Sequence, residues 1–351
     1  MLKKYITPLL IAFAGFGLNA QCPPGDVILS SQAEVDAFVA DYPDCTELAG
    51  DVLIGDFEGT TDIVNISGLS NLTSIVGSLH ILRNSDITSL IGLDQLTSIE
   101  GNLYLGFNNG IASLTGLSQL SSINGRFTLI KNDNLTSLTG LGQLSSIGGG
   151  FAVVRNDTLT SLTGLEGLTT IGGSLQVIEN SNLTSLTGLE GLVAIGRDLN
   201  IEDNVVLGSL TGLENLNATT INNLVITWNS QLSNCTIESI CDYLGMAMNT
   251  VAISGNATGC ATREEVETAC MVPATDISQT NIELFPNPTN GMLQLRNITA
   301  KEVVIYTAQG QRIARYGNPG QELNLSALPA GVYHLHLITA DAVFAARVMK
   351  Q

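Results

Sequence analysis

The sequence predicts a mostly β protein: a three-sided, right-handed β-solenoid with helical, disulfide-bonded caps, followed by a small C-terminal β-sandwich. The first observation is the motif SLTGL, which recurs at a spacing of 24 residues from 113–117 to 209–213. The second is an alternating segment of the type Gly-x-Leu-x-Ile, which recurs with the same period. The third is a change of composition near residue 283. A fixed short period is typical of stacked repeats, in which no repeat buries its apolar face alone.

Residues 1–20 have the features of a secretory signal peptide. Lys3 and Lys4 precede the apolar run ITPLLIAFAGFGL, and Ala20 precedes the expected cleavage point. Leu18 is larger than the residue preferred three positions before a cut, so the exact cleavage site stays open. No later apolar run reaches the roughly 18 residues of a membrane-spanning helix. We therefore expect an exported mature chain without a transmembrane helix.

The two ends of the repeats are expected to carry caps, at residues 21–50 and 235–270, because a raw sheet edge must be covered. In the first cap, 31–40 has the pattern of an amphipathic helix that opens with a Ser-x-x-Glu capping box. In the second cap, we expect short helices at 236–248 and 262–270.

All six cysteines lie in the caps, and an even number of cysteines in an exported chain indicates disulfides. Cys22 and Cys45 bracket the first helix and are expected to pair. Closing that loop would add about 3 kcal/mol on the chain-entropy model. The four cysteines of the second cap allow three pairings, of which we favour Cys235–Cys260 with Cys241–Cys270.

The repeats occupy residues 51–234, and one 24-residue copy is called a rung here. Each rung carries several glycines and many Thr, Ser and Asn residues, which are poor in helix interiors. Coils of three short strands are therefore favoured over helices. The alternating segments predict nine strands, from Val52-Leu-Ile54 to Val251-Ala-Ile253, with inward Leu, Ile, Val and Phe columns. Burying one such side chain is worth about 1.5–3 kcal/mol.

An asparagine follows the strand in every rung. A calcium ladder is one interpretation, because Asp86, Asp133, Asp157 and Asp203 lie close by. Calcium sites need several carboxylates at one point, however, and these acids do not recur at a fixed offset. We expect instead a ladder whose side-chain amides satisfy backbone groups at a tight turn. The column consists of Asn84, Asn108, Asn132, Asn156, Asn180, Asn204, Asn229 and Asn256.

Residues 22–270 as a whole resemble the receptor L-domain. The resemblance is carried by the first cysteine, the helix, the segment DCTELAGDVLI at 44–54, the Gly-x-Leu-x-Ile strands and the asparagine turns. That family is the leucine-rich-repeat-like β-solenoid of the ligand-binding modules in insulin and epidermal-growth-factor receptors. The resemblance implies a fold but no ligand, because L-domain contacts lie in variable surface positions. This chain departs from the receptors in its more regular repeats and in having no cysteine-rich module or kinase.

After a predicted linker at 271–282, residues 283–351 alternate as short strands between turns that contain Pro, Asn or Gly. The segments 282–295, 303–313 and 323–337 closely resemble the type A C-terminal sorting domain of the type IX secretion system of certain Gram-negative bacteria. The resemblance implies export through the periplasm and outer membrane, with the outer-membrane secretion machinery as partner. The preceding part, called the passenger here, would then be secreted or attached to the cell surface. The motif residues are Phe285, Pro286, Asn287, Pro288, Gly291, Gly310, Leu328, Gly331 and Tyr333.

The charge of the passenger and the motifs that the sequence lacks narrow the range of expected functions. Residues 21–282 hold 28 acidic and six basic residues, so the passenger should be repelled by phosphate backbones and anionic membranes. Nucleic-acid binding is thus disfavoured. The sequence has no serine elbow, P-loop, dinucleotide fingerprint or CxxC zinc pattern. We expect no enzymatic activity, no cofactor and no metal, and a polysaccharide-acting or other hydrolase is the remaining enzymatic alternative.

The outward positions of the long sheet differ between rungs, whereas the inward positions repeat. Leu82, Ile130, Val154 and Ile178 are expected to form an apolar stripe, and an exposed stripe can mark a partner site. The alternative is that these positions are unconstrained or are covered by a loop. The candidate binding face consists of His80, Leu82, Tyr104, Arg126, Thr128, Ile130, Val154, Gln176 and Ile178.

The function predicted from these patterns is that of an exported, non-enzymatic binding or adhesion protein, which contacts a protein or glycan through the candidate binding face. A structural surface or matrix protein without a discrete ligand is the alternative. The sequence does not name the ligand.

Overall fold

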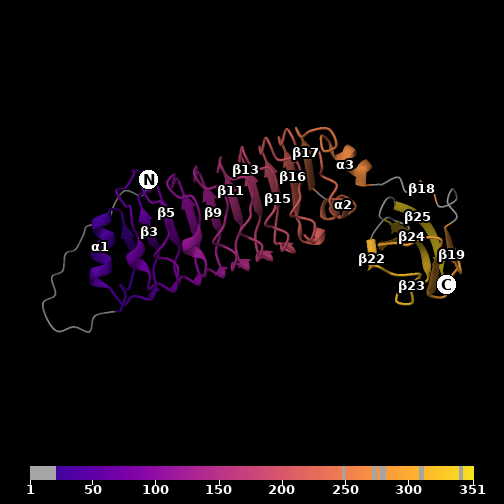
Figure 1. The fold of residues 1–351 in the computed structure, drawn as a ribbon, viewed down its shortest axis with the longest axis horizontal. Helices are drawn as coiled ribbons and strands as arrows, with labels where there is room; N and C mark the ends of the chain where they lie inside the picture. The colour runs from indigo at the N-terminus through magenta and orange to yellow at the C-terminus, as the bar shows by residue number, and fades with distance from the viewer. Residues whose placement is uncertain (1–20, 247–249, 271–274, 277–281, 308–311, 340–342) are drawn as a thin grey trace.

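The computed structural model describes residues 21–246, 250–270, 275–276, 282–307, 312–339 and 343–351. The predicted signal peptide and Gly310 lie outside these residues, as does most of the predicted linker. Figure 1 shows the passenger as an elongated stack of strands that runs from α1 at one end to α3 at the other, followed by a smaller β domain.

Two parallel sheets run the length of the passenger. Strands β5 to β15 of the long sheet pair each residue with the residue 24 positions on, as in Leu79 with Leu103, so every rung adds one strand. The nine strands predicted for this sheet are present. A tenth, β1, pairs with β3 outside the repeats. The long sheet contains β1 (Val27–Leu29), β3 (Val52–Gly55), β5 (Leu79–Leu82), β7 (Leu103–Gly106), β9 (Phe127–Ile130), β11 (Phe151–Val154), β13 (Leu175–Ile178), β15 (Leu199–Glu202), β16 (Asn223–Thr227) and β17 (Thr250–Ser254).

The second sheet is narrow, with strands of two residues each. It has seven strands in parallel order, one for each rung from the first cap to the rung that contains β15. The strands are β2 (Glu47–Leu48), β4 (Ser74–Ile75), β6 (Ser98–Ile99), β8 (Ser122–Ile123), β10 (Ser146–Ile147), β12 (Thr170–Ile171) and β14 (Ala194–Ile195).

The third side of each rung differs from the expectation of three strands per coil. Among the described residues of the passenger, it carries no named strand and only one isolated bridge, Ser209 with Asn234. Successive rungs are joined there by single backbone hydrogen bonds, such as Leu138 N–H to the Thr163 oxygen at 2.9 Å. A glycine with positive φ interrupts the extended run, as at Gly164 (φ +113°). In the rungs that contain η1 (Ser67–Leu69) and η2 (Thr115–Leu117), this segment forms a 3-10 turn instead.

One hydrophobic core fills the passenger from the first cap to the last helix. The inward positions of both sheets are Leu, Ile, Val or Phe and are almost completely buried in every rung. Phe127 and Phe151 occupy one inward column on neighbouring strands, and their rings stack at 4.9 Å. The core therefore repeats with the period of the sequence, apart from this aromatic pair.

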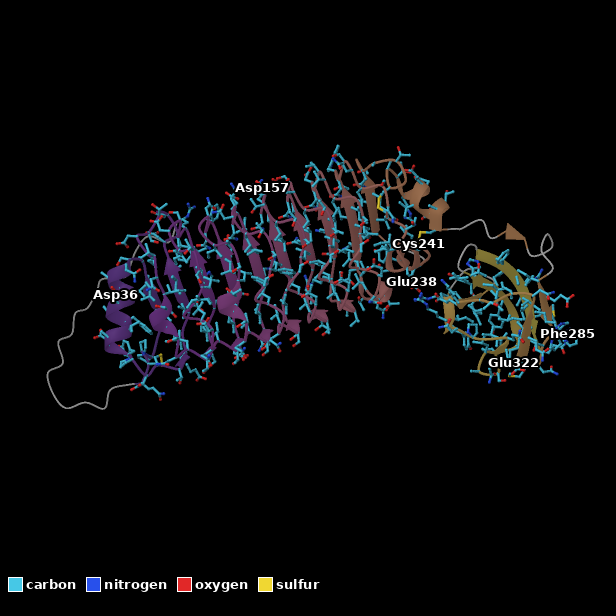
Figure 2. The ribbon with its side chains drawn as sticks, in the orientation of Figure 1. Asp36, Asp157, Glu238, Cys241, Phe285 and Glu322 are labelled. Atoms are coloured by element: carbon cyan, nitrogen blue, oxygen red, sulfur yellow. A yellow bond between two sulfur atoms is a disulfide. The ribbon has the colours of Figure 1, made fainter. Side chains whose placement is uncertain are left out.

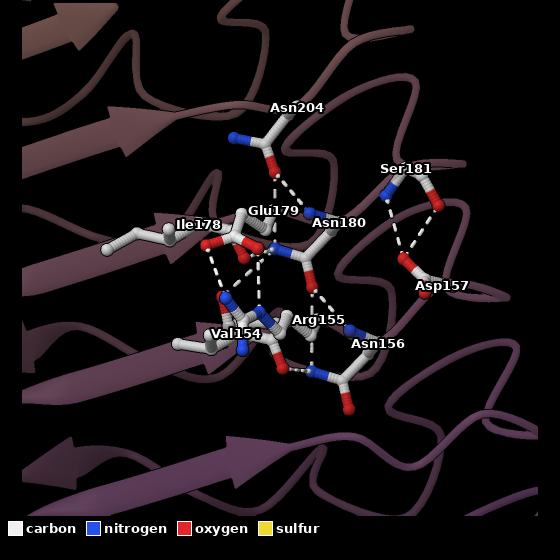
Figure 3. A network of polar contacts seen from close by, with 10 residues as sticks. Val154, Arg155, Asn156, Asp157, Ile178, Glu179, Asn180, Ser181 and Asn204 are labelled. Atoms are coloured by element: carbon white, nitrogen blue, oxygen red, sulfur yellow. Dashed lines mark hydrogen bonds and ion pairs between the residues drawn. The ribbon is translucent and has the colours of Figure 1, made fainter.

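The asparagine ladder lies where the long strands end. Each ladder asparagine donates from its backbone N–H and its Nδ2 to the Oδ1 of the next rung's asparagine, as between Asn156 and Asn180 (Figure 3). Nδ2 also donates to a strand carbonyl one rung back, such as Leu129 O at 3.0 Å. The column is buried from Asn84 to Asn229. Its amides thus satisfy buried backbone groups that would otherwise lack partners.

The two ends of the ladder are closed by different groups. At the first rung, the Thr61 hydroxyl donates to Asn84 Oδ1 at 2.6 Å. At the last rung, Asn256 Nδ2 donates to the Cys260 carbonyl at 3.1 Å. The ladder therefore begins at Thr61 before the first regular rung and ends at Cys260 in the second cap, and the amide at each end has a hydrogen-bond partner.

Helices cap the passenger close to where the sequence predicts them. Helix α1 (Gln32–Asp41) follows the N-cap Ser31, whose hydroxyl accepts from Glu34 N–H. Helix α3 (Arg263–Cys270) opens in the same way after Thr262. Helix α2 (Glu238–Leu244) is shorter than the predicted 236–248, and Gly245 is its C-cap. A 3-10 turn, η3 (Ala218–Thr220), precedes β16. The disulfides join Cys22 to Cys45, Cys235 to Cys260 and Cys241 to Cys270.

The C-terminal domain has two sheets that share one core, in which Leu293 and Leu295 meet Val303 and Leu335. Part of the predicted linker forms β18, which pairs in parallel with β25. An isolated bridge, Thr289 with Lys350, is also parallel, and the other strand pairings are antiparallel. One sheet contains β19 (Glu283–Phe285), β20 (Met292–Arg296) and β23 (Glu322–Asn324). The other contains β18 (Thr275–Asp276), β25 (Val343–Lys350), β24 (Gly331–Ile338), β21 (Glu302–Thr307) and β22 (Arg312–Gly317).

The C-terminal domain contacts the passenger through charged side chains. Arg312 on β22 forms ion pairs with Glu238 and Asp242 of α2, and Arg315 reaches Glu238 at 2.6 Å. Figure 2 shows Glu238 on the side of the cap that faces this domain. The contact joins two arginines of β22 to two carboxylates of α2.

Replacing a ladder residue tests the role of the ladder. Asn132→Ala removes the acceptor of the Asn108 N–H and the donor to the Leu105 carbonyl, both buried. We expect a loss of about 3 kcal/mol in the free energy of unfolding, measured by chemical denaturation. Asn134→Ala, at an exposed position two residues on, is the matched control. Equal stability of the two variants would contradict the role of the ladder.

Two glycines of neighbouring rungs give a second matched pair. A Cβ at Gly164 would lie 2.2 Å from the Leu138 carbonyl oxygen, and its φ of +113° is strained for other residues. Gly142 is exposed with open space around its Cβ position. We expect Gly164→Ala to cost roughly 3 kcal/mol and Gly142→Ala to stay within about 1 kcal/mol, as measured by thermal unfolding.

Candidate binding face

The outward face of the long sheet carries side chains that differ from rung to rung. In register order, one outward column consists of His80, Tyr104, Thr128, Ala152 and Gln176. The parallel pairing places these residues side by side along the passenger. Among the candidate residues, Arg126 is exposed and Leu82 is buried. The others are half-buried: His80, Tyr104, Thr128, Ile130, Val154, Gln176 and Ile178.

Three aromatic side chains lie in a row at the first rungs of this face. Phe57 follows β3, and its ring meets that of His80 edge-on at 6.2 Å. The His80 ring stacks with that of Tyr104 at 6.1 Å. We call Phe57, His80 and Tyr104 the aromatic strip. Phe57 is 63% exposed and did not figure among the residues identified from sequence, because its segment lies before the regular repeats.

A glycine explains why Leu82 is buried. The position of a Cβ at Gly106 lies within 3.3 Å of atoms from Tyr104, Ile130 and Leu82, so these side chains close over the glycine from three sides. The apolar stripe expected from sequence is therefore a partly covered band, in which Ile130, Val154 and Ile178 remain half-buried.

The long side chain of Arg126 crosses the face over the next rung. Its guanidinium passes 3.5 Å from the position of a Cβ at Gly150, and Nη1 donates to Gln176 Oε1 at 3.5 Å, two rungs away. Arg126 and Gln176 thus approach each other over Ala152, which is buried beneath them. This geometry places polar groups directly beyond the aromatic strip.

A second variable column, which we call the turn column, borders this face. Its residues precede the ladder asparagines, and all have φ between +52° and +61°. This column was not predicted from the sequence, although each of its residues directly precedes a ladder asparagine. The turn column consists of Arg83, Phe107, Lys131, Arg155, Glu179, Asp203 and Trp228.

Several charged side chains of the turn column have partners within the column. The Arg83 guanidinium lies 4.7 Å from the centre of the Phe107 ring, and Lys131 Nζ lies 5.9 Å from it. Arg155 forms a two-fold hydrogen-bonded ion pair with Glu179, at 2.6 and 3.0 Å (Figure 3). The Arg155 hydrogen bond lowers the pKa of the Glu179 carboxyl.

Other acids have structural partners. The pKa of Asp56 is lowered mainly because its carboxylate accepts backbone hydrogen bonds from Glu58 and Gly59, with a smaller effect of the Arg83 charge. Glu166 and Glu190 accept from the N–H groups of the positive-φ glycines Gly164 and Gly188. Within the residues that the structure describes, no group of three His, Cys, Asp or Glu side chains is placed to hold a metal ion.

In the C-terminal domain, the predicted motif residue Asn287 joins the segment that follows β19 to the last strand, β25. Asn287 donates from Nδ2 to Arg347 O and accepts from Met349 N–H, at 2.8 and 3.0 Å. Gly291 has φ +138° and packs against Ser326. The Tyr333 hydroxyl donates to Pro329 O at 2.7 Å.

The remaining motif residues divide between core and surface. Leu328 packs against the domain core, and Gly331 begins β24. Phe285 is exposed, and the Arg296 guanidinium lies 5.6 Å from its ring centre. The Phe285–Pro286 and Asn287–Pro288 peptide bonds are cis.

Comparison with protein families identifies this domain. Residues 283–351 match the family described as the secretion system C-terminal sorting domain. They are therefore a type IX secretion sorting domain, which implies interaction with that machinery and export to the cell surface or beyond. The chain matches no curated protein and no solved structure. No helix in the described ranges is long and apolar enough to cross a membrane.

The ion pair in the turn column predicts a titration behaviour. Since Arg155 lowers the pKa of Glu179 in the folded state, the pair stabilises the fold above the unfolded-state pKa of glutamate. That contribution disappears as the pH falls through the lowered value. We expect the Glu179 carboxyl to titrate below its usual range by NMR, and Arg155→Gln to move its pKa upward. An unchanged pKa in Arg155→Gln would show that the pair does not form in solution.

Proposed function

We propose that this protein is an exported, non-enzymatic binding or adhesion protein, which contacts a protein or glycan through the outward face of the long sheet. The observation that carries the proposal is a contrast between the two sides of one strand. Inward residues repeat from rung to rung, whereas outward residues of the same strands change in size, charge and aromatic character. A sheet held by a uniform core leaves its outward positions free for recognition.

The fold assignment behind this function is also a proposal in its finer detail. We propose that the passenger is a right-handed β-solenoid of the receptor L-domain kind. The parallel pairing at intervals of 24 residues and the disulfide-bonded helical cap before the first rung support it. The two strands per rung, with an irregular third side, also suit a leucine-rich-repeat-like coil.

A structural surface or matrix protein is the second candidate. The half-burial of Ile130, Val154 and Ile178 favours it, because a face that covers its own apolar side chains needs no partner. The two candidates differ in whether single outward side chains matter for attachment.

Substitutions on the face separate these candidates. We expect the double variant Tyr104→Asp with Ile130→Asp to lose attachment to cells or to an extracellular matrix, because two charges would enter a partly apolar contact. The measurement is adhesion of the purified, refolding-competent protein to whole cells.

The matched control is Val76→Asp with Val193→Asp, which changes two exposed apolar residues next to the narrow sheet. Adhesion should persist in this control. Adhesion that survives in both double variants would remove the long sheet from the proposed function and favour the structural candidate.

A further inference from the structure

The aromatic strip gives the face a defined chemistry. Its three rings belong to consecutive rungs and contact one another at 6.2 and 6.1 Å, so they form one apolar platform along the stack. The Phe57 ring is the most exposed phenylalanine of the passenger, at 63%. His80 and Tyr104 are half-buried, and the exposed Phe57 ring has a cost in water unless a ligand covers it.

Polar groups continue the row beyond the last ring. Thr128 pairs with Tyr104 in register, and Gln176 follows two rungs later in the same column. The Arg126 guanidinium adds donors above Ala152. A ligand that lies along this column meets rings first and then hydroxyl, amide and guanidinium groups.

A sugar polymer matches this order of groups. A pyranose ring has an apolar C–H surface that packs on an aromatic ring, and hydroxyl groups at its edge that need hydrogen-bond partners. The strip has one ring per rung, with ring centres 6.2 and 6.1 Å apart, so neighbouring sugar units can contact neighbouring rings. The Phe57 and His80 rings meet at 61°, so the row offers both ring edges and ring faces to a chain of repeated units.

The charges indicate that the polymer is uncharged. The passenger holds 28 acidic against six basic residues, which repels uronate, sulfate and phosphate groups at long range. The cations near the strip have partners of their own: Arg126, on the face itself, donates to Gln176, Arg83 and Lys131 lie over Phe107, and Arg155 pairs with Glu179.

We propose that the aromatic strip, continued by Thr128 and Gln176, binds an uncharged polysaccharide that lies along the stack. This inference rests on the proposed function and names its ligand class. Phe57, His80 and Tyr104 provide the stacking surface, and the polar continuation fixes the direction of the chain on the face.

The test uses the full chain and soluble polysaccharides. Laminarin, xylan, mannan and dextran are the uncharged probes, and polygalacturonate is the charged one, with binding measured by calorimetry and affinity electrophoresis. We expect at least one uncharged probe to bind, with little dependence on salt. Phe57→Ala and Tyr104→Ala should each weaken it roughly tenfold. Trp228→Ala, which removes a ring of 61% exposure on a later rung, is the matched control and should bind normally.

The outcomes separate this inference from the function on which it rests. Binding of polygalacturonate alone, with steep salt dependence and loss in Arg83→Gln, would overturn the inference in favour of an anionic ligand on the turn column. Equal weakening by Trp228→Ala would overturn the role of the strip. If no probe binds while the Tyr104 and Ile130 variant still abolishes adhesion, the face is functional and the polysaccharide is wrong.

Discussion

The asparagine ladder is the constraint on which the passenger depends. Each ladder residue ends a long strand, satisfies the backbone of its neighbours and so forces the residue before it into the left-handed conformation. Because every rung from Asn84 onward obeys the same constraint, the strands from β5 to β17 end at one line. The outward columns are then in register, so His80 and Tyr104 become neighbours, and Phe57, which precedes the first ladder asparagine, contacts His80.

Much of this architecture is readable from sequence because the period exposes it. The inward columns and the ladder follow from residues compared across equivalent positions of the rungs, whereas the capping helices and the favoured cysteine pairs follow from capping motifs and the number of cysteines. The features that were not predicted from sequence are ones that a comparison between rungs does not reveal. Strand β1 precedes the first repeat, and β18 pairs only with the last strand of the chain. The third side lacks a strand because of the backbone conformation at its glycines, which composition alone does not reveal.

The side chains of the candidate binding face were also predicted only in part from the sequence. Alternation places Leu82 outward, and it does point outward, but Gly106 lets Tyr104 and Ile130 close around it. The turn column was missed because alternation assigns its residues to the inside, whereas a positive φ turns them away from the strand pattern. The family of the C-terminal domain, by contrast, was predictable from its motif residues. Asn287 is bound to Arg347 and Met349 near the end of the chain, and Gly291 has a positive φ, so both positions restrict the residue type.

The stacked phenylalanines of the interior have a consequence for assembly of the coil. Rungs that are nearly identical can associate out of order, since a strand offers almost the same leucines to a distant copy as to its true neighbour. Phe127 and Phe151 break that degeneracy. A chain that skipped a rung would seat each ring against a smaller side chain, overfilling one layer and leaving a void in another. The pair therefore favours the native order of the rungs over arrangements in which one rung is skipped.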